Sequence, residues 1–344
     1  MKKIQKSLLA VIIGFMTLTV SANPTGGEQE YLKKAESKYI AHNIEGAISD
    51  LNKAIEINPS FVDAYIKRAD YEMEIKDFKN ANADYNQAYK LDPSQSSTLL
   101  HKGISEVKIE KYSDAVKSMD AFLKTNSGNT EASFYRGYAR MELKQYPQAV
   151  ADFQTVIAKD SKNMEAYLYS GICKDEEANH VGAILDYTKA IGISPNDTRA
   201  YFNRGNSNNM LGDYHKAIQD FNKVIELDPK DYDAYYHRAN AESAHGNIPK
   251  ALEDVNKSLA INPQNQGGYA LRGFMLGEDN KLTEAIADLD RAISMDATDG
   301  LSYYHRGIYK YKLKDKSACD DFNKAVVLGE TQAAAMVKKT CGKK

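Results

Sequence analysis

The prolines of the sequence recur with a period of 34 residues, and this period limits the possible folds more than any other feature. Five of them lie at the same phase: Pro59, Pro93, Pro195, Pro229 and Pro263. A fixed period of this length is typical of stacked copies of one supersecondary unit, each too small to bury a core alone. We therefore divide the chain at this period and number the positions of each copy from 1 to 34.

The copy at residues 198–231 shows what one unit contains. Small and aromatic residues recur every three to four positions from Ala200, which predicts a short amphipathic helix. Gly212 marks a turn, and an apolar stripe around Phe221 predicts a second helix that ends at Pro229. One unit is therefore expected to be a pair of short helices.

The pattern continues through nine copies, which together occupy most of the chain. Their boundaries are 28–61, 62–95, 96–129, 130–163, 164–197, 198–231, 232–265, 266–299 and 300–332. The third copy is the least regular, because Phe122 fills a slot that is small elsewhere and Ser127 replaces the proline. Residues 333–344 are expected to form a capping helix with a basic tail, since the last unit would otherwise expose its apolar face.

With these features the chain resembles the tetratricopeptide repeat (TPR) family over residues 28–332. The resemblance implies an all-α, right-handed α-solenoid, or superhelix, of helix-turn-helix units. Small residues at positions 8 and 20 fit this interpretation, because they let helix axes approach closely. The chain departs from the family pattern in having no Trp and in using Arg at position 7, where Leu is usual.

Each arginine at position 7 is matched by an aspartate late in the same unit. The matched residues are Arg68 and Asp84, Arg136 and Asp152, Arg204 and Asp220, Arg238 and Asp254, Arg272 and Asp288, and Arg306 and Asp321. Where position 7 is Lys102, the partner position holds Ser118. This matching predicts an ion pair that is repeated between the two helices of the units.

Proteins of the TPR family bind peptides or protein segments in a concave groove lined by the first helices, mainly through positions 2, 5, 9, 12 and 13. Position 5 is apolar here and is never Lys, so the family's carboxylate clamp for acidic C-termini is not carried over. The resemblance implies a groove site at Phe134, Leu168, Phe202, Asn206, Asn209, Tyr236 and Asn240. The Asn amides are expected either to hydrogen-bond an extended peptide backbone or to be ordinary exposed polar residues.

No motif for nucleotide binding or nucleophilic catalysis is present, and the seven His residues are dispersed. The nearest approach to a metal site is the segment Asp175 to Glu177 with His180, because Glu176 and His180 share a helical face. We favour a structural interpretation, since His180 fills the position 17 slot that holds Tyr or Phe elsewhere. We therefore expect no catalytic residue, no metal and no cofactor.

The N-terminus has the pattern of a secretory signal. Lys2, Lys3 and Lys6 precede an apolar run, and residues 20–22, Val-Ser-Ala, fit a cleavage site after Ala22. An uncleaved membrane anchor is the alternative, but the run is shorter than the roughly 20 residues that span a bilayer. We expect a signal peptide at 1–22, a linker at 23–27, and an exported protein, periplasmic or secreted, without stable membrane insertion after cleavage.

The net charge limits the classes of expected partner, and the cysteine content limits the number of possible disulfides. The formal charge is −2 and becomes −5 without the N-terminal segment, which gives no electrostatic footprint for nucleic acid or an anionic membrane. Three cysteines are too few for a disulfide scaffold. Cys319 and Cys341 are expected either to form a bridge, because the capping helix packs beside the last repeat, or to remain two buried thiols.

These observations predict a non-catalytic protein-protein interaction scaffold of the bacterial cell envelope. It would bind a peptide or protein segment of unknown identity in the groove around repeats four to seven. The alternative is a structural subunit of a larger envelope complex that uses its convex face or its ends. Groove substitutions distinguish the two, because they abolish binding only in the first case.

Overall fold

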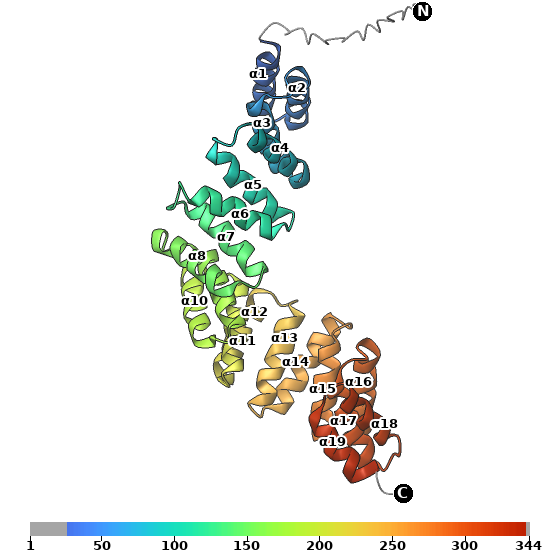
Figure 1. The fold of residues 1–344 in the computed structure, drawn as a ribbon. Coiled ribbons are helices and arrows are strands. Elements are labelled where there is room, and N and C mark those ends of the chain that lie inside the picture. Colours follow the sequence, from blue (N-terminus) through green and yellow to red (C-terminus); the bar gives the residue numbers. More distant parts are fainter. Residues whose placement is uncertain (1–25, 342–344) are drawn as a thin grey trace, which may run out of the picture. The chain divides into compact units, whose positions relative to one another are not determined.

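The computed structural model describes residues 26–341, and this part of the chain consists of consecutive helices without a strand (Figure 1). The first helices of the nine units are α1 (Gly27–Ile40), α3 (Val62–Glu74), α5 (Ser96–Lys108), α7 (Thr130–Glu142), α9 (Met164–Glu176), α11 (Thr198–Met210), α13 (Tyr232–Ala244), α15 (Gln266–Glu278) and α17 (Gly300–Lys312). The second helices are α2 (Ile44–Ile57), α4 (Phe78–Leu91), α6 (Tyr112–Leu123), α8 (Tyr146–Lys159), α10 (His180–Ile193), α12 (Tyr214–Leu227), α14 (Ile248–Ile261), α16 (Leu282–Met295) and α18 (Ala318–Val327). The all-α prediction is therefore confirmed, whereas the predicted signal segment lies outside the described residues.

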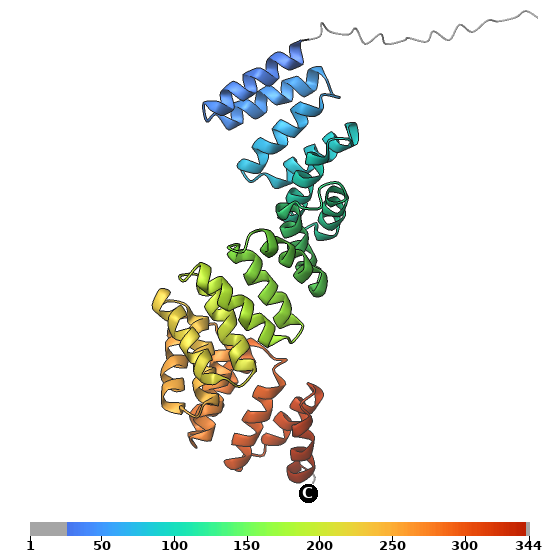
Figure 2. The same cartoon turned by 90° about the vertical axis from the view of Figure 1, so that its left-hand side faces the viewer.

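The chain divides into two compact units between Thr125 and Asn126, at the end of the irregular third repeat. The first unit contains α1 to α6, and the second begins with α7. Every first helix packs against the second helix of its own repeat, and from the second repeat of each unit onward it also packs against the second helix of the preceding repeat. Figure 2 shows these helix pairs following one another along the chain, as the 34-residue period predicts.

The turn inside every repeat contains one residue in the left-handed region of backbone conformation. These residues recur every 34 positions, with φ between 57° and 91°: His42, Lys76, Glu110, Lys144, Ala178, Gly212, Gly246, Asn280 and Lys314. Only two of them are glycine, the residue that this conformation favours. The packing of the flanking helices therefore imposes the turn even where the local residue disfavours it.

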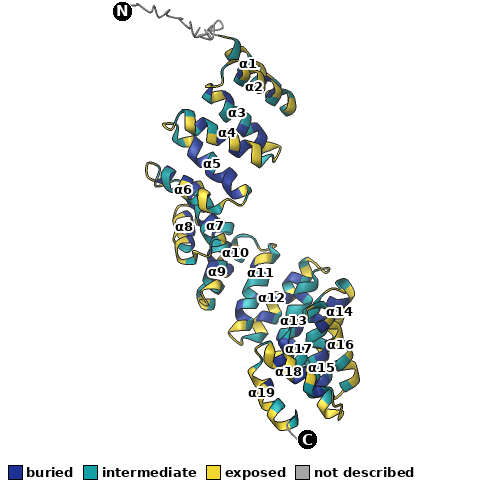
Figure 3. Cartoon of the chain, turned by 45° about the vertical axis from the view of Figure 1, so that its right-hand side comes forward, coloured by how far each residue is buried: buried dark blue, intermediate teal, exposed yellow. Residues whose placement is uncertain are grey.

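The core lies between the helices of each pair, and in several repeats a glycine on the first helix faces a large ring on the second. Phe221 is fully buried, and a β-carbon added to Gly205 would lie 2.9 Å from its ring. A β-carbon added to Gly277, on α15, would lie 2.0 Å from the ring of Tyr309, on α17 of the next repeat. Figure 3 shows the buried residues along the helix faces that meet their neighbours, with exposed residues on the outer faces.

The predicted ion pairs are present in all six matched repeats. In each, the guanidinium donates to the carboxylate at 2.5 to 2.8 Å through its Nη2 atom: Arg68 to Asp84, Arg136 to Asp152, Arg204 to Asp220, Arg238 to Asp254, Arg272 to Asp288 and Arg306 to Asp321. The aspartates are buried, so each pair is a charge-assisted contact in the interior of the repeat. In the third repeat Lys102 Nζ donates to Ser118 Oγ at 3.3 Å instead.

Several of these arginines also reach the second helix of the preceding repeat through Nη1. Arg238 donates to Asn222 at 2.6 Å, and Arg272 donates to Asn256 at 2.7 Å. One planar guanidinium therefore binds two helices at once while its own stem belongs to a third. The sequence pattern predicted the pair within a repeat but not this second link between repeats.

The C-terminal cap begins slightly earlier than predicted. Helix α19 (Thr331–Met336) and a π-helical turn (Val337–Cys341) follow α18, and Ala333 is fully buried. Cys319 and Cys341 form a disulfide with a Cα to Cα distance of 5.6 Å, whereas Cys173 is a buried free thiol. Of the two expectations for this pair, the bridge is the one that the structure contains.

Candidate functional site

A pocket of about 460 Å³ lies in the second unit, where α13, α15 and α17 come together. Its residues occupy the positions at which the groove was expected: Gly267 and Leu301 at position 2, Tyr236 and Ala270 at position 5, and Asn240 and Phe274 at position 9. Leu271, Leu289 and His305 complete its apolar part. The pocket therefore has a mainly hydrophobic surface with an amide at one side.

Small residues create this pocket. Gly267 and Ala270, on α15, leave space between the larger side chains of α13 and α17. A β-carbon on Gly267 would approach the Tyr236 hydroxyl to 2.9 Å, so even an alanine there would fill part of the opening. The pocket thus depends on a local pairing of small and aromatic residues rather than on a feature shared by all repeats.

Aromatic rings hold the deeper part of the pocket in place. The His305 ring lies edge-on to Phe274 at 4.9 Å between centroids and is stacked with the buried ring of Tyr309. Burial lowers the pKa of His305, so this imidazole is neutral at pH 7. Leu301, in contrast, is 51% exposed at the rim, where an incoming side chain can contact it.

Asp299 is the one carboxylate of the pocket lining, and neighbouring donors already occupy it. It caps the N-terminus of α17 by accepting from the Ser302 backbone N at 3.0 Å and from the Ser302 hydroxyl at 2.5 Å. Gln266 Nε2 donates to it at 2.7 Å. Its hydrogen-bonding capacity therefore serves the fold, and the pocket surface offers little to a charged ligand.

The structure places the predicted site residues in different environments. Tyr236 and Asn240 line the pocket. Phe134 and Phe202 are half-buried and packed edge-on against other rings, Phe202 at 5.0 Å from His237. Leu168 is only 1% exposed and packs in the core with Tyr187, so it is not an accessible anchor.

The two remaining predicted amides, Asn206 and Asn209, are partly buried and lie outside the pocket lining. The Oδ1 atom of Asn209 is buried and has no hydrogen-bond partner within residues 26–341. Phe274, Leu301 and His305 also line the pocket; they belong to repeats eight and nine and are not among the predicted site residues. The run of small residues at Gly267 and Ala270 was the signal in the sequence that could have indicated this location.

The acidic segment before His180 forms an internal hydrogen-bond network. His180 Nδ1 lies 2.9 Å from Asp175 Oδ1, while the hydroxyls of Tyr187 and Ser207 donate to Asp175 Oδ2 at 2.8 and 2.7 Å. These contacts explain why both His180 and Asp175 are only partly exposed. In the part of the chain that the structure describes, no group of three or more His, Cys, Asp or Glu side chains is arranged to hold a metal ion.

None of the helices that the structure describes has the length and apolar character to cross a bilayer. This finding applies to residues 26–341. The predicted signal segment lies before that range, so its role as a signal or an anchor stays a prediction.

Four family models with the description tetratricopeptide repeat match the sequence, at residues 62–95, 100–163 with 138–198, 198–231, and 221–253. No curated protein matches it. Among solved structures, a tetratricopeptide repeat protein from Parabacteroides merdae has a TM-score of 0.55 and 20% identity, over 72% of this chain and 98% of its own.

Two further solved structures are similar in fold. The C-terminal part of a TPR repeat-containing protein from Cytophaga hutchinsonii has a TM-score of 0.59 and 18% identity, and the match covers 70% of this chain and 98% of that one. The APC/C hetero-tetramer Cut9-Hcn1 has a TM-score of 0.54 and 15% identity, over 81% of this chain and 55% of that one. At these identities the likeness concerns the fold alone.

Proposed function

Since the chain belongs to the tetratricopeptide repeat family, in which the repeats are protein-interaction modules, we propose that it is a non-catalytic scaffold that binds a partner segment at the pocket of α13, α15 and α17. The observation that carries this proposal is that the pocket lies at the repeat positions expected to bind a ligand. The groove positions 2, 5 and 9 of consecutive first helices line one open pocket. A partner segment running across the first helices would meet all of these positions.

The chemistry of the pocket favours an apolar side chain as the inserted group. Tyr236, Phe274 and Leu301 offer hydrophobic contact, while the neutral His305 adds no charge. Asn240 supplies an amide that donates to and accepts from a peptide backbone. Binding is therefore expected to depend weakly on salt concentration, because salt screens interactions between charges and the contacts described here are hydrophobic or made by an amide.

We place the scaffold in the bacterial cell envelope, as an exported protein. The Lys-rich start and the cleavage pattern at Ala22 support this assignment. The Cys319–Cys341 bridge supports it too, because stable disulfides belong to oxidising compartments such as the periplasm. N-terminal sequencing of protein recovered from cells tests it, since an exported and processed chain begins at Asn23 and an intact Met1 would contradict it.

The partner is identified by cross-linking and pull-down from the envelope, and its affinity is then compared among variants. Tyr236→Ala should weaken binding by about 1 to 3 kcal/mol, because aromatic anchors dominate such surfaces, and Leu301→Ala, at the rim, should weaken it less. Lys216→Ala and Lys223→Ala, on α12, are the controls and should change little. Unchanged binding in the pocket variants, with circular dichroism showing a folded chain, would reject this pocket as the site.

A second candidate function is that of an assembly subunit that uses the second-helix side. A pocket of about 420 Å³ between α10, α11 and α12 exposes Val181, Leu185 and Leu211, at 62%, 65% and 49%. Exposed apolar side chains in one place are typical of interaction surfaces. Leu185→Arg separates the two functions, because it should release the partner only if this side carries the contact.

A further inference from the structure

A separate pocket of about 600 Å³ lies in the first unit between α2, α3 and α4. Its lining carries four carboxylates, Glu45, Glu72, Asp77 and Asp84, and the single guanidinium of Arg68. Arg68 is already bound on both sides, because it donates to Asp84 at 2.7 Å and to Asn52 at 2.7 Å. The pocket therefore has excess negative charge, and its only cation is already engaged.

Glu72 is the unusual member of this lining. Its side chain is 7% exposed, and its Oε2 atom has no hydrogen-bond partner among the described residues. Burial, followed by the charge of Asp84, raises the pKa of Glu72 to about 7. Buried carboxylates are normally paired, so this one lacks the counter-group that its position requires.

Other repeats show what normally occupies this place. Glu72 stands at position 11, where four repeats carry a basic side chain bound to the aspartate at position 23, or at position 22 in the ninth repeat, whose turn is one residue shorter. These pairs are Lys38 to Asp50, Arg140 to Asp152, Lys174 to Asp186 and Lys310 to Asp321, at 2.5 to 2.9 Å. In the sixth repeat the Asn208 amide donates to Asp220 at 3.2 Å. The second repeat has an acid where these repeats have a donor.

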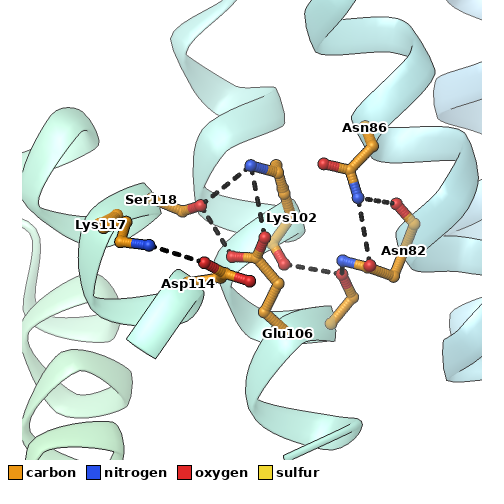
Figure 4. A network of polar contacts seen from close by, with 8 residues as sticks. Asn82, Asn86, Lys102, Glu106, Asp114, Lys117 and Ser118 are labelled. Atoms are coloured by element: carbon orange, nitrogen blue, oxygen red, sulfur yellow. Dashed lines mark hydrogen bonds and ion pairs between the residues drawn. The ribbon is translucent and has the colours of Figure 1, made fainter. Parts of the chain in front are cut away.

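The acid at position 11 of the third repeat has partners inside its own repeat. Figure 4 shows Glu106 between the Ser118 hydroxyl, which donates to it at 2.7 Å, and Lys102, whose ammonium lies 3.3 Å away. Glu106 therefore has both a hydrogen-bond donor and a counter-charge, although it is as deeply buried as Glu72.

The seventh repeat also has an acid at position 11, Glu242, and provides different partners for it. Glu242 accepts from Asn247 Nδ2 at 2.9 Å and lies 3.8 Å from Lys250 Nζ. The equivalent residues of the second repeat are Asp77 and Asn80, and these bind each other, with Asn80 Nδ2 donating to Asp77 Oδ2 at 2.8 Å. The second repeat thus provides no internal donor for its own acid.

We infer that this pocket binds a lysine side chain of a partner protein, whose ammonium group donates to Glu72 Oε2. Among the described residues, Glu72 Oε2 is the one buried acceptor of the lining without a partner, and a single acceptor suits a compact ammonium better than the two-pronged guanidinium of arginine. Ile48 and Ile75 stand on the pocket wall, where they can pack against the aliphatic stem. This site shares no residue with the pocket of α13, α15 and α17 and stands independently of it.

NMR titration of the whole chain tests the inference with a defined probe, the peptide acetyl-Gly-Ser-Lys-Ser-Gly-amide. The Glu72 carboxyl carbon and the amides of residues 45–84 should shift saturably at millimolar peptide. The same peptide with norleucine, which keeps the stem and lacks the charge, should not produce these shifts. Equal shifts from both peptides, or none from either, would overturn the inference.

Three variants sharpen the test. Glu72→Gln should weaken lysine-peptide binding on the order of tenfold, since the charged acceptor is lost. Asp77→Asn with Asn80→Lys copies the seventh repeat and should block binding although Glu72 is still present. Glu242→Gln is the matched control and should bind as the wild type does.

Three results count against the inference, the third from a titration with butylamine in place of the peptide. Retained binding in the Glu72→Gln protein, or an equal loss in the Glu242→Gln protein, would show that Glu72 is not the acceptor. Butylamine that binds as tightly as the peptide would assign the pocket to small free amines instead of a protein side chain.

Discussion

Arg204 and Asp220 join the two helices of the sixth repeat by a bidentate contact. Nε donates to Oδ2 at 3.0 Å and Nη2 donates to Oδ1 at 2.7 Å. The third nitrogen, Nη1, donates to Thr188 of the preceding repeat at 3.0 Å. The Asp220 side chain is 6% exposed, so removal of the arginine leaves a nearly buried carboxylate with only the Asn208 amide as a donor.

We therefore predict strong coupling between these two residues. Arg204→Ala alone should lower the free energy of unfolding by about 3 kcal/mol, because it strands a buried charge. In the Asp220→Ala background the same substitution should cost less, with a coupling energy of about 1 to 3 kcal/mol. Denaturant unfolding of the four proteins measures this cycle, and additive losses would contradict the prediction.

A control for this cycle is available on the surface. Arg199 binds Glu165 at 2.7 Å, but its side chain is 48% exposed. Arg199→Ala should therefore change the free energy of unfolding by no more than about 1 kcal/mol.

A second prediction concerns Gly277, on α15. A β-carbon there would lie 2.0 Å from the ring of Tyr309, which is fully buried and donates its hydroxyl to the Phe274 carbonyl at 3.2 Å. Gly277→Ala should lower the free energy of unfolding by about 1 to 3 kcal/mol, because the Tyr309 ring must move in a packed core. Gly192→Ala, on α10 with open space around it, should be neutral or stabilise by up to about 1 kcal/mol. Thermal unfolding of both variants decides the comparison.

The left-handed turns allow a reciprocal test. Ala178 adopts φ 57° and Gly212 adopts φ 77° at the same position of adjacent repeats. Ala178→Gly should stabilise by up to about 1 kcal/mol, because a non-glycine residue is strained there, and Gly212→Ala should destabilise by a similar amount. Melting temperatures that move in the same direction for both substitutions would refute this account.

Glu72 predicts a dependence of stability on pH. Its pKa is about 7 in the folded state against an ordinary value of 4.5, so the folded state binds the proton more tightly. The contribution of protonated Glu72 to the free energy of unfolding is complete below pH 4.5 and is lost as the pH rises to 7. Relative to wild type, Glu72→Gln should gain about 1 to 3 kcal/mol at pH 8 and nothing at pH 4.5. Urea unfolding at both pH values measures the difference, and a pH-independent difference would contradict the prediction.

The fold was predictable from the sequence because its information is repeated. The residue spacing of a single short helix is ambiguous, but the same spacing in nine copies identifies the helix. In the same way, Arg and Asp recur 15 or 16 residues apart in six copies, which indicates that they form a pair. The turn conformation at Ala178 was not predictable, because no local preference of alanine produces it. It follows from how two neighbouring helices pack.

The proposed binding pocket lies at repeat positions that the sequence predicted, but partly in other repeats. Positions 2, 5 and 9 were expected to face a ligand, and Tyr236 and Asn240 do line the pocket. The pocket extends into repeats eight and nine, beyond the repeats expected from the sequence, where the small residues Gly267 and Ala270 lie beside larger ones. A row of apolar residues at one position does not report this, as the buried side chain of Leu168 shows.

The last prediction concerns the C-terminal bridge. Cys319→Ser with Cys341→Ser should increase hydrogen exchange in residues 331–341 and leave α11 and α12 unchanged, because each repeat contacts only its neighbours. Mass spectrometry of the unfolded, unreduced wild type should find these two cysteines protected from alkylation. Two alkylated thiols at these positions would rule out the bridge.

The position of this bridge also orders events during synthesis. Five of the six paired arginines also bond backward, to a second helix that precedes them in the chain and has therefore already been synthesised, as Arg238 does to Asn222. Each new repeat can therefore dock as it emerges. Cys341 follows all nine repeats in the chain, so the covalent link to Cys319 closes only after the ninth pair and its cap have been made. An oxidised Cys319–Cys341 pair thus marks a chain whose synthesis has passed every repeat.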